Sequence, residues 1–182
     1  ILGVGLGAHP TTEFSAFGED GDAKRRGRKL DEALDVIAGL WRGEPFEYNG
    51  EFYTVQEAHF MPGPVQSPRI PIWVAGSWRD NGKHKPFRRA ARYDAVFPLA
   101  PGRDTTPEDF AAIGVLIARH RTSGEPFDMV CGRTLDEQGI CEAAQIDAFA
   151  AVGVTWWVPG AMHSNWDLDK IRGLIRRGPP SS

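Results

Sequence analysis

The feature that most constrains the fold of this chain is the alternation of short apolar runs with longer amphipathic stretches. Short continuous apolar runs are typical of strands buried in a parallel sheet, and apolar residues spaced three or four apart indicate helices. Strands that alternate with helices require a parallel sheet with right-handed crossovers. We therefore predict an α/β fold, with residues 1–182 as a single domain. The predicted strands are residues 2–6, 72–75, 95–97, 127–131 and 154–158.

Helical patterns lie between and after the predicted strands. A basic stretch at residues 24–29 leads into the first helix, which Gly43 and Pro45 stop. A second helix start is marked by residues 106–109, with Thr at the N-cap, Pro in the first turn and acids near the positive end of the helix dipole. Further helices are predicted at residues 87–92, at 142–152, and from the capping-box-like segment 164–167 to Gly178.

A β-hairpin is predicted between the first helix and the second strand of the sheet. Asn49 and Gly50 lie between the aromatic-rich runs 46–48 and 51–55. Both residue types accept the positive φ angles of a type I′ turn, which is the favoured two-residue connection between antiparallel strands. The pattern therefore predicts a hairpin with a type I′ turn at Asn49-Gly50.

Composition excludes several function classes. Of the 182 residues, 41% are hydrophobic and 25% are charged, and the formal net charge is −3. A disordered chain is less apolar and more highly charged, and a dedicated nucleic-acid binder is more basic. No apolar run reaches the roughly 18 residues that span a bilayer. Cys131 and Cys141 suffice neither for a disulfide framework nor for a zinc site, so we expect a cytoplasmic protein with reduced thiols.

A glycine run near the N-terminus is the first candidate site. Residues 3–8 match the relaxed dinucleotide fingerprint G-x-G-x-x-A. That fingerprint holds a pyrophosphate only where its loop opens a helix, whereas here His9 and Pro10 follow and the apolar helical pattern starts only at Leu30. We therefore favour a barrel-type strand whose glycines let a ligand approach the backbone, and a nucleotide-binding Rossmann module is the alternative.

The segment Ala75-Gly76-Ser77-Trp78 is the second candidate site. It directly follows the most apolar predicted strand, and ligands of parallel α/β folds lie beyond the carboxyl ends of strands. A Gly-Ser turn presents backbone amides and a hydroxyl that suit a phosphate. Nearby cations would supply countercharge, and they are Arg79, Lys83, Lys85 and Arg88. The alternative is an ordinary turn before a solvated basic loop.

One histidine is a candidate for proton transfer. The five histidines are scattered along the chain, so no metal site is predicted. His9 lies just past the carboxyl end of the first strand, where a proton-transfer group can act. We name His9 as the candidate catalytic residue, with a polar surface role as the alternative.

Several motifs along residues 2–76 carry a family resemblance through their order and spacing. They are residues 2–7 (LGVGLG), 13–14 (EF), 17–18 (FG), 28–34 (RKLDEAL), 40–46 (LWRGEPF), 49–53 (NGEFY), 60–66 (FMPGPVQ) and 71–76 (PIWVAG). Together they resemble the luciferase-like monooxygenase family, the flavin-dependent barrel proteins related to bacterial luciferase. From residues 90–94 to the end of the chain the resemblance is looser but continuous.

The resemblance implies a (β/α)8 TIM-barrel fold of which this chain is a part. The predicted strands then correspond to the family's strands four to eight, and the hairpin is an insertion before strand five. A complete barrel of this type has roughly 250 residues, so strands one to three would lie outside this chain. We expect a missing N-terminal segment or a homodimer partner to cover the open sheet edges.

The resemblance also implies a cofactor, either FMN used with O2 or the deazaflavin coenzyme F420 as a hydride carrier. It puts the cofactor's phosphate at the turn of Gly76, Ser77 and Trp78. Bacterial luciferase has an arginine on its fourth strand where this sequence has Leu6, so the backbone or a cation such as Arg79 must meet the phosphate. The isoalloxazine ring is expected against strand ends formed by Leu6, Gly7, Ala8, Val74, Ala75, Phe97 and Pro98.

Two functions follow from the resemblance. The first is a luciferase-like flavin-dependent monooxygenase or oxidoreductase that acts on a small organic substrate. Its partners would include a flavin reductase that supplies reduced FMN, and neither nucleic acid nor a membrane is expected among them. The second is a truncated, non-catalytic flavin-binding or interaction protein that needs a partner to complete its barrel.

Overall fold

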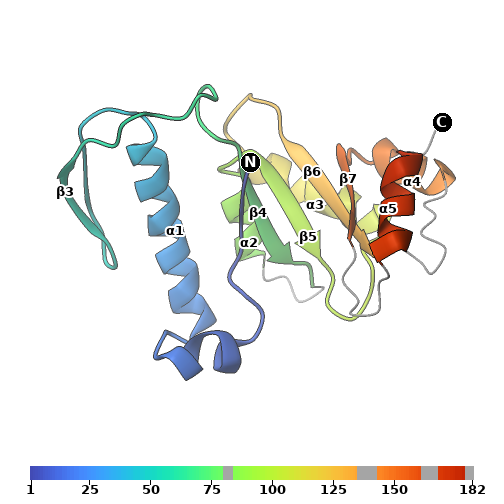
Figure 1. Cartoon of the computed structure of the whole chain (residues 1–182), viewed down its shortest axis with the longest axis horizontal. Helices are drawn as coiled ribbons and strands as arrows, with labels where there is room; N and C mark the ends of the chain where they lie inside the picture. The colour runs from blue at the N-terminus through green and yellow to red at the C-terminus, as the bar shows by residue number, and fades with distance from the viewer. Residues whose placement is uncertain (80–83, 135–142, 161–167, 179–182) are drawn as a thin grey trace. The chain divides into compact units, whose positions relative to one another are not determined.

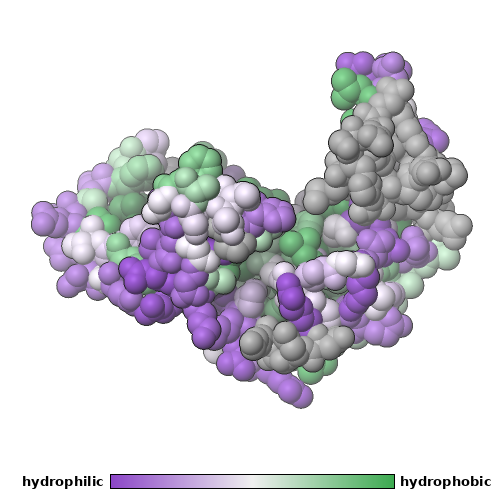
Figure 2. Space-filling model, turned by 90° about the horizontal axis from the view of Figure 1, so that it is seen from below, coloured by the Kyte–Doolittle hydropathy of each residue, from purple (hydrophilic) through white to green (hydrophobic). Residues whose placement is uncertain are grey.

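The computed structural model describes residues 1–79, 84–134, 143–160 and 168–178. By its internal contacts the chain divides into two compact units, Ile1–Ile72 and Trp73–Ser182 (Figure 1). The assignment of residues 1–182 to one domain stays a prediction. Among the described residues no helix is long and apolar enough to cross a membrane. Figure 2 shows hydrophobic residues scattered among hydrophilic ones on the face that it presents.

The first unit contains one strand, one long helix and a hairpin. Its Leu2 amide donates a hydrogen bond of 2.8 Å to the Pro71 carbonyl, so the first strand lies beside the last residues of the unit. The elements are strand β1 (Leu2–Val4), π-helix η1 (Pro10–Phe14), 3-10 helix η2 (Ser15–Phe17), helix α1 (Ala23–Leu40), and strands β2 (Phe46–Asn49) and β3 (Thr54–Ala58).

Helix α1 begins earlier than the apolar pattern predicts. The side chain of Asp22 accepts hydrogen bonds from the backbone amides of Lys24 and Arg25, and this caps the helix at its N-terminus. The basic stretch at residues 24–29 therefore forms the first turns of α1 and does not merely precede it. Leu34, in the middle of the helix, is fully buried and belongs to the apolar stripe.

The hairpin is confirmed, but the predicted type I′ turn is wrong. Strands β2 and β3 pair antiparallel, with Asn49 opposite Thr54, so the connection consists of the four residues 50–53. Neither Asn49 nor Gly50 has the positive φ angle that a type I′ turn requires. The Gly50 amide instead donates to the Tyr53 carbonyl at 2.9 Å and closes a wider loop.

The carboxylate of Glu32, on α1, determines the shape of this loop. It accepts hydrogen bonds from the backbone amides of Glu51 at 2.8 Å, Phe52 at 2.9 Å and Tyr53 at 3.1 Å. A Cβ atom on Gly50 would lie 2.3 Å from a Glu32 carboxylate oxygen, so a side chain at this position would displace the carboxylate. Desolvation raises the pKa of Glu32, but the hydrogen bonds from these three amides and the charge of Arg28 outweigh it and lower the pKa.

Replacing Glu32 with Gln tests this arrangement. Because the folded-state pKa of Glu32 lies below the ordinary value of 4.5, its stabilisation of the loop is present above that pH and is lost as the pH falls through the folded value. We expect hydrogen-exchange protection of the Glu51, Phe52 and Tyr53 amides to fall with pH in this way. In E32Q the protection should be lower and independent of pH, whereas in the control E47Q it should match the parent. Equal protection in E32Q and the parent would contradict the account.

The second unit is an α/β layer with a parallel sheet. The strand order is β4-β5-β6-β7, and each neighbouring pair is parallel. The strands are β4 (Ile72–Ser77, starting at the last residue of the first unit), β5 (Ala95–Leu99), β6 (Asp128–Thr134) and β7 (Trp156–Gly160). The helices are α2 (Lys85–Ala90), α3 (Pro107–His120), α4 (Ala143–Ala151) and α5 (Leu168–Arg177).

The strand and helix order predicted from sequence is confirmed, with bounds that differ by a few residues. The Thr106 cap is present as a full capping box, in which the Thr106 hydroxyl accepts from the Asp109 amide and the Asp109 carboxylate accepts from the Thr106 amide. The capping segment predicted at residues 164–167 lies outside the described residues.

The two faces of the strand β4 differ in burial. Along β4, residues 72, 74 and 76 are buried, and residues 73, 75 and 77 are half-buried. On the buried face Gly76 lies against Pro86 and Phe87 of α2, so this is the face that the helices cover. The core there includes Ile72, Val74, Phe87, Val96, Phe110 and Ile113.

Two tryptophans on the other face show that this sheet is strongly curved. The rings of Trp73 on β4 and Trp156 on β7 meet edge to face, with centroids 5.2 Å apart. In a flat sheet β4 and β7 would be about 14 Å apart, because two strands lie between them. The half-buried face is therefore concave, and its amino-terminal end is filled by indole rings.

Candidate functional site

The residues predicted to form the site divide between the two units. Leu6, Gly7, Ala8 and His9 follow β1 in the first unit. The others belong to the second unit, where they lie on β4 and β5, just after β4, or on α2. Lys83 lies outside the described residues.

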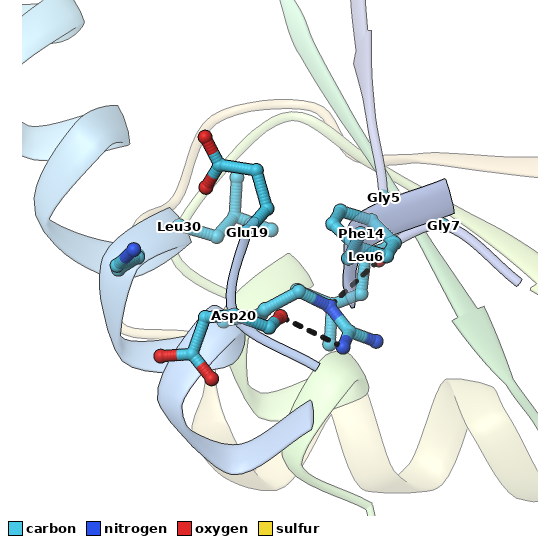
Figure 3. Close-up of a pocket in the computed structure, with 9 residues that line it drawn as sticks. Gly5, Leu6, Gly7, Phe14, Glu19, Asp20 and Leu30 are labelled. Carbon is cyan, nitrogen blue, oxygen red and sulfur yellow. Dashed lines mark hydrogen bonds between the residues drawn. The ribbon is translucent and has the colours of Figure 1, made fainter. Parts of the chain in front are cut away.

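A cavity of about 220 Å³ lies beyond β1 in the first unit (Figure 3). Its lining combines acidic and basic side chains with apolar ones. Of the predicted residues, Leu6 and Gly7 line it, whereas Ala8 and His9 are exposed and do not. The lining residues are Gly5, Leu6, Gly7, Phe14, Glu19, Asp20, Arg26, Lys29 and Leu30.

Arg26 connects the wall of this cavity to the start of α1. Its guanidinium donates to the carbonyls of Leu6 at 3.3 Å, Asp20 at 3.3 Å and Gly21 at 2.5 Å, and it lies over the Phe14 ring at 4.2 Å. The residue is only 9% exposed, and a planar fork of donors can satisfy several carbonyls at once. Arg26 thus fixes the chain between β1 and α1.

Gly7 is required by its backbone conformation and by close packing. Its φ angle is +73°, and a Cβ atom would lie 2.7 Å from Glu13 and Phe14 side-chain atoms. Glu13 also accepts a hydrogen bond of 2.9 Å from the Ala8 amide. The glycine run therefore ends in a turn that the η1 segment holds in place. The short π-helix η1 follows it, and the long helix α1, of the kind that the dinucleotide fingerprint requires directly after the glycines, begins only at Ala23.

Removing the Arg26 side chain tests its role in the first unit. Arg26→Ala leaves three carbonyls without this donor, so we expect the free energy of unfolding to fall by about 1–3 kcal/mol. The control is Arg25→Ala, which breaks an exposed ion pair with Asp20 and should cost less than about 1 kcal/mol. Urea denaturation measures both losses, and equal losses in the two variants would contradict the role of Arg26.

At the carboxyl end of β4, the predicted residues alternate between the two faces of the sheet. The half-buried residues Ala75, Ser77 and Phe97 are on the concave face, with Ala75 opposite Phe97 in the register. Val74, Gly76 and Pro98 are buried on the helix-covered face. Only the first three residues can present a side chain on the concave side.

The predicted Gly-Ser turn is part of the strand. Gly76 and Ser77 are the last residues of β4 and pair with Pro98 and Leu99, and the Trp78 amide donates to the Leu99 carbonyl at 2.7 Å. A Cβ atom on Gly76 would lie 2.5 Å from Cβ of Pro86, so glycine allows α2 to pack against the strand. The chain leaves the sheet only after Trp78, because this pairing extends β4.

Trp78 lies in an aromatic cluster beside the end of β4. Its ring stacks on His84, with centroids 4.8 Å apart, and meets Phe87 edge to face at 5.3 Å. Within the described part of the chain, the buried Nδ1 atom of His84 has no hydrogen-bond partner. The side chains of Arg79 and of Lys85 and Arg88 on α2 are exposed, so these cations lie at the surface of the second unit.

The indole of Trp78 is hydrogen-bonded to Asp109, which the sequence pattern indicated only as part of a helix start. Nε1 of Trp78 donates to Oδ1 of Asp109 at 2.8 Å, and Asp109 also binds the guanidinium of Arg103 through both of its oxygens. The hydrogen bond from Arg103 is the largest of several influences that lower the pKa of Asp109, against a smaller opposing effect of burial. Asp109 is therefore a carboxylate at neutral pH.

Among the residues that the structure describes, no group of three His, Cys, Asp or Glu side chains is arranged to hold a metal ion. The groups that the two regions present are backbone groups, a serine hydroxyl, aromatic rings and paired charges. A strand end with a hydroxyl, rings and cations can bind a ligand that joins an aromatic system to a phosphate.

Comparison with known proteins decides the family. The family model for luciferase-like monooxygenases matches residues 1–135. The chain belongs to this family. Its members include oxidoreductases that depend on a flavin and others that depend on F420. The assignment of individual residues to a cofactor stays a prediction.

Two curated relatives illustrate the range of the family. The oxygenase component of the flavin-dependent trigonelline monooxygenase of Acinetobacter baylyi is 36% identical over 84 residues, which cover 46% of this chain and 22% of that protein. The F420-dependent glucose-6-phosphate dehydrogenase of Microbacterium testaceum is 35% identical over 77 residues, which cover 42% of this chain and 22% of that protein. The first curated relatives are matched over 30% of their own length.

Solved structures show the same fold. The coenzyme F420 dependent tetrahydromethanopterin reductase from Methanopyrus kandleri aligns with a TM-score of 0.66 and 15% identity, over 96% of this chain and 72% of that one. At this identity the alignment shows the fold alone. It supports an α/β fold with a parallel sheet and a hairpin, as sequence reasoning predicted.

Proposed function

We propose that this chain is the cofactor-binding part of a flavin- or F420-dependent oxidoreductase, with the cofactor's phosphate beside Ser77 and Trp78. The observation that carries the proposal is the concave face of the second unit, whose carboxyl-terminal end presents Ser77 and whose amino-terminal end is filled by Trp73 and Trp156. Ligands of parallel α/β barrels lie at the carboxyl ends of the strands. The family match supports this choice of ligand.

The curvature of the sheet supports the barrel arrangement. The Trp73–Trp156 contact needs a sheet that bends toward its half-buried face, as barrel strands do. We therefore assign β1, β4, β5, β6 and β7 to strands four to eight of a (β/α)8 barrel, with the β2–β3 hairpin as an insertion.

The residues at the carboxyl ends of β4 and β5 fit such a cofactor. Ala75 is small and Phe97 is flat, so together they can support a ring system, and the Ser77 hydroxyl can donate to a phosphate oxygen. Reduced FMN, when bound, supplies electrons for reaction with oxygen, and reduced F420 supplies a hydride. The contribution of this chain is to bind and orient the cofactor. Contacts of Leu6, Gly7, Ala8 and a proton-transfer role of His9 are further parts of the proposal.

Ser77→Ala tests the proposal directly. Loss of a charge-assisted hydrogen bond should weaken the binding of FMN or F420 by about 10- to 100-fold. Fluorescence titration of the purified chain with each cofactor measures this and also distinguishes the flavin from the deazaflavin. Ser123→Ala, in the loop after α3, is the control and should bind like the parent. Binding of neither cofactor by the parent chain, or equal binding by S77A, would overturn the proposal.

A second candidate function is a binding protein that acts only with a partner. Exposed apolar side chains of the second unit favour it, because Trp156 is 45%, Leu168 66% and Ile175 72% exposed. A second copy of the chain or a further segment of the barrel could cover them. Sedimentation measurements with and without cofactor distinguish this candidate, which predicts cofactor binding without turnover unless the partner is present.

A further inference from the structure

We propose that Asp109 is a positioning residue of the cofactor site, because its carboxylate holds the Trp78 indole and the Arg103 guanidinium in one arrangement at the carboxyl ends of β4 and β5. The inference rests on the proposed function, which puts the phosphate beside Ser77 and Trp78. Asp109 lies on α3, 31 residues after Trp78 in the sequence.

Both oxygens of the Asp109 carboxylate have two donors. Oδ1 accepts from Nε1 of Trp78 at 2.8 Å and from Nη2 of Arg103 at 2.9 Å. Oδ2 accepts from Nη1 of Arg103 at 2.5 Å and from the Thr106 amide at 2.9 Å. A carboxylate offers about four acceptor sites, so these four hydrogen bonds fix its orientation. The orientation of the carboxylate in turn fixes the two side chains that it binds.

The Trp78 ring is positioned by packing and by this hydrogen bond together. His84 stacks on its face and Phe87 meets it edge to face, and these contacts restrict the ring without setting the direction of its N–H group. The hydrogen bond to Asp109 supplies that direction. Trp78 is the residue at which the chain leaves the sheet, and the proposed function puts the phosphate at this point of the chain.

The ion pair of Asp109 and Arg103 favours an anionic ligand through its charges. The Asp109 side chain is 11% exposed, whereas the Arg103 side chain is 45% exposed. A carboxylate alone at this strand end would repel a phosphate, but the bidentate ion pair neutralises it and presents the guanidinium outward. Arg103 is thus a cation that this end of the sheet can offer to a phosphate.

The variant Asp109→Asn distinguishes a positioning role from an effect of charge, because the two predict opposite changes in the affinity for the cofactor's phosphate. Without the carboxylate Arg103 loses its bidentate ion pair with residue 109, so charge alone would strengthen phosphate binding. Loss of positioning weakens it. We expect D109N to bind FMN about tenfold more weakly than the parent, and to bind riboflavin, which lacks the phosphate, equally well. If the cofactor is F420, the comparison is with its phosphate-free deazaflavin. Asp109→Glu, which keeps the carboxylate, should recover most of the affinity.

Thr106→Ala is the matched control for damage to the helix. It removes the other half of the capping box but leaves the contacts of Asp109 with Trp78 and Arg103. T106A should lower the midpoint of thermal unfolding, as D109N does, while its FMN affinity stays that of the parent.

The outcomes distinguish this inference from the proposed function. A parent chain that binds neither cofactor overturns both. A parent that binds FMN while D109N binds it equally or more tightly overturns the inference alone. Equal weakening of riboflavin, or equal weakening in T106A, would also overturn it, because the effect would then be structural.

Discussion

The contact between Trp73 and Trp156 is the interaction on which the rest of the second unit depends. Two strands separate β4 from β7, so their rings meet only if the sheet bends toward the face that carries them. The bend brings two indole rings together at the amino-terminal end of that face, and the proposed ligand site is at its carboxyl-terminal end. Burial of the opposite face under helices gives the sheet its core.

The alternation of faces along each strand decides which predicted residues can act through side chains. Ala75 and Ser77 are on the concave face. Val74 and Gly76, which alternate with them along β4, are buried on the opposite face, under the helices. Gly76 has a packing reason to be glycine, since it allows Pro86 to lie against the strand. A site predicted from consecutive residues of a strand therefore names about twice as many residues as can present a side chain on one face of the sheet.

Features of local origin were predictable from the sequence. The order of strands and helices follows from apolar patterns, and the capping box at Thr106 and Asp109 involves residues three apart. Features that depend on distant residues were not. The hairpin loop takes its shape from Glu32, about twenty residues away, and the hydrogen bond of Trp78 comes from Asp109 on another element. A single sequence holds no signal for such pairs, because the fold alone brings them together.

The central claim is that the carboxyl ends of β4 and β5 receive the cofactor's phosphate. It is tested most directly by nuclear magnetic resonance of the ¹⁵N-labelled chain during titration with FMN and, separately, with riboflavin. The account predicts that FMN shifts the backbone amide signals of Ser77 and Trp78 and the indole signal of Trp78, and that riboflavin shifts them much less. Shifts confined to the residues around Arg26, or equal shifts of Ser77 and Trp78 with both ligands, would contradict it.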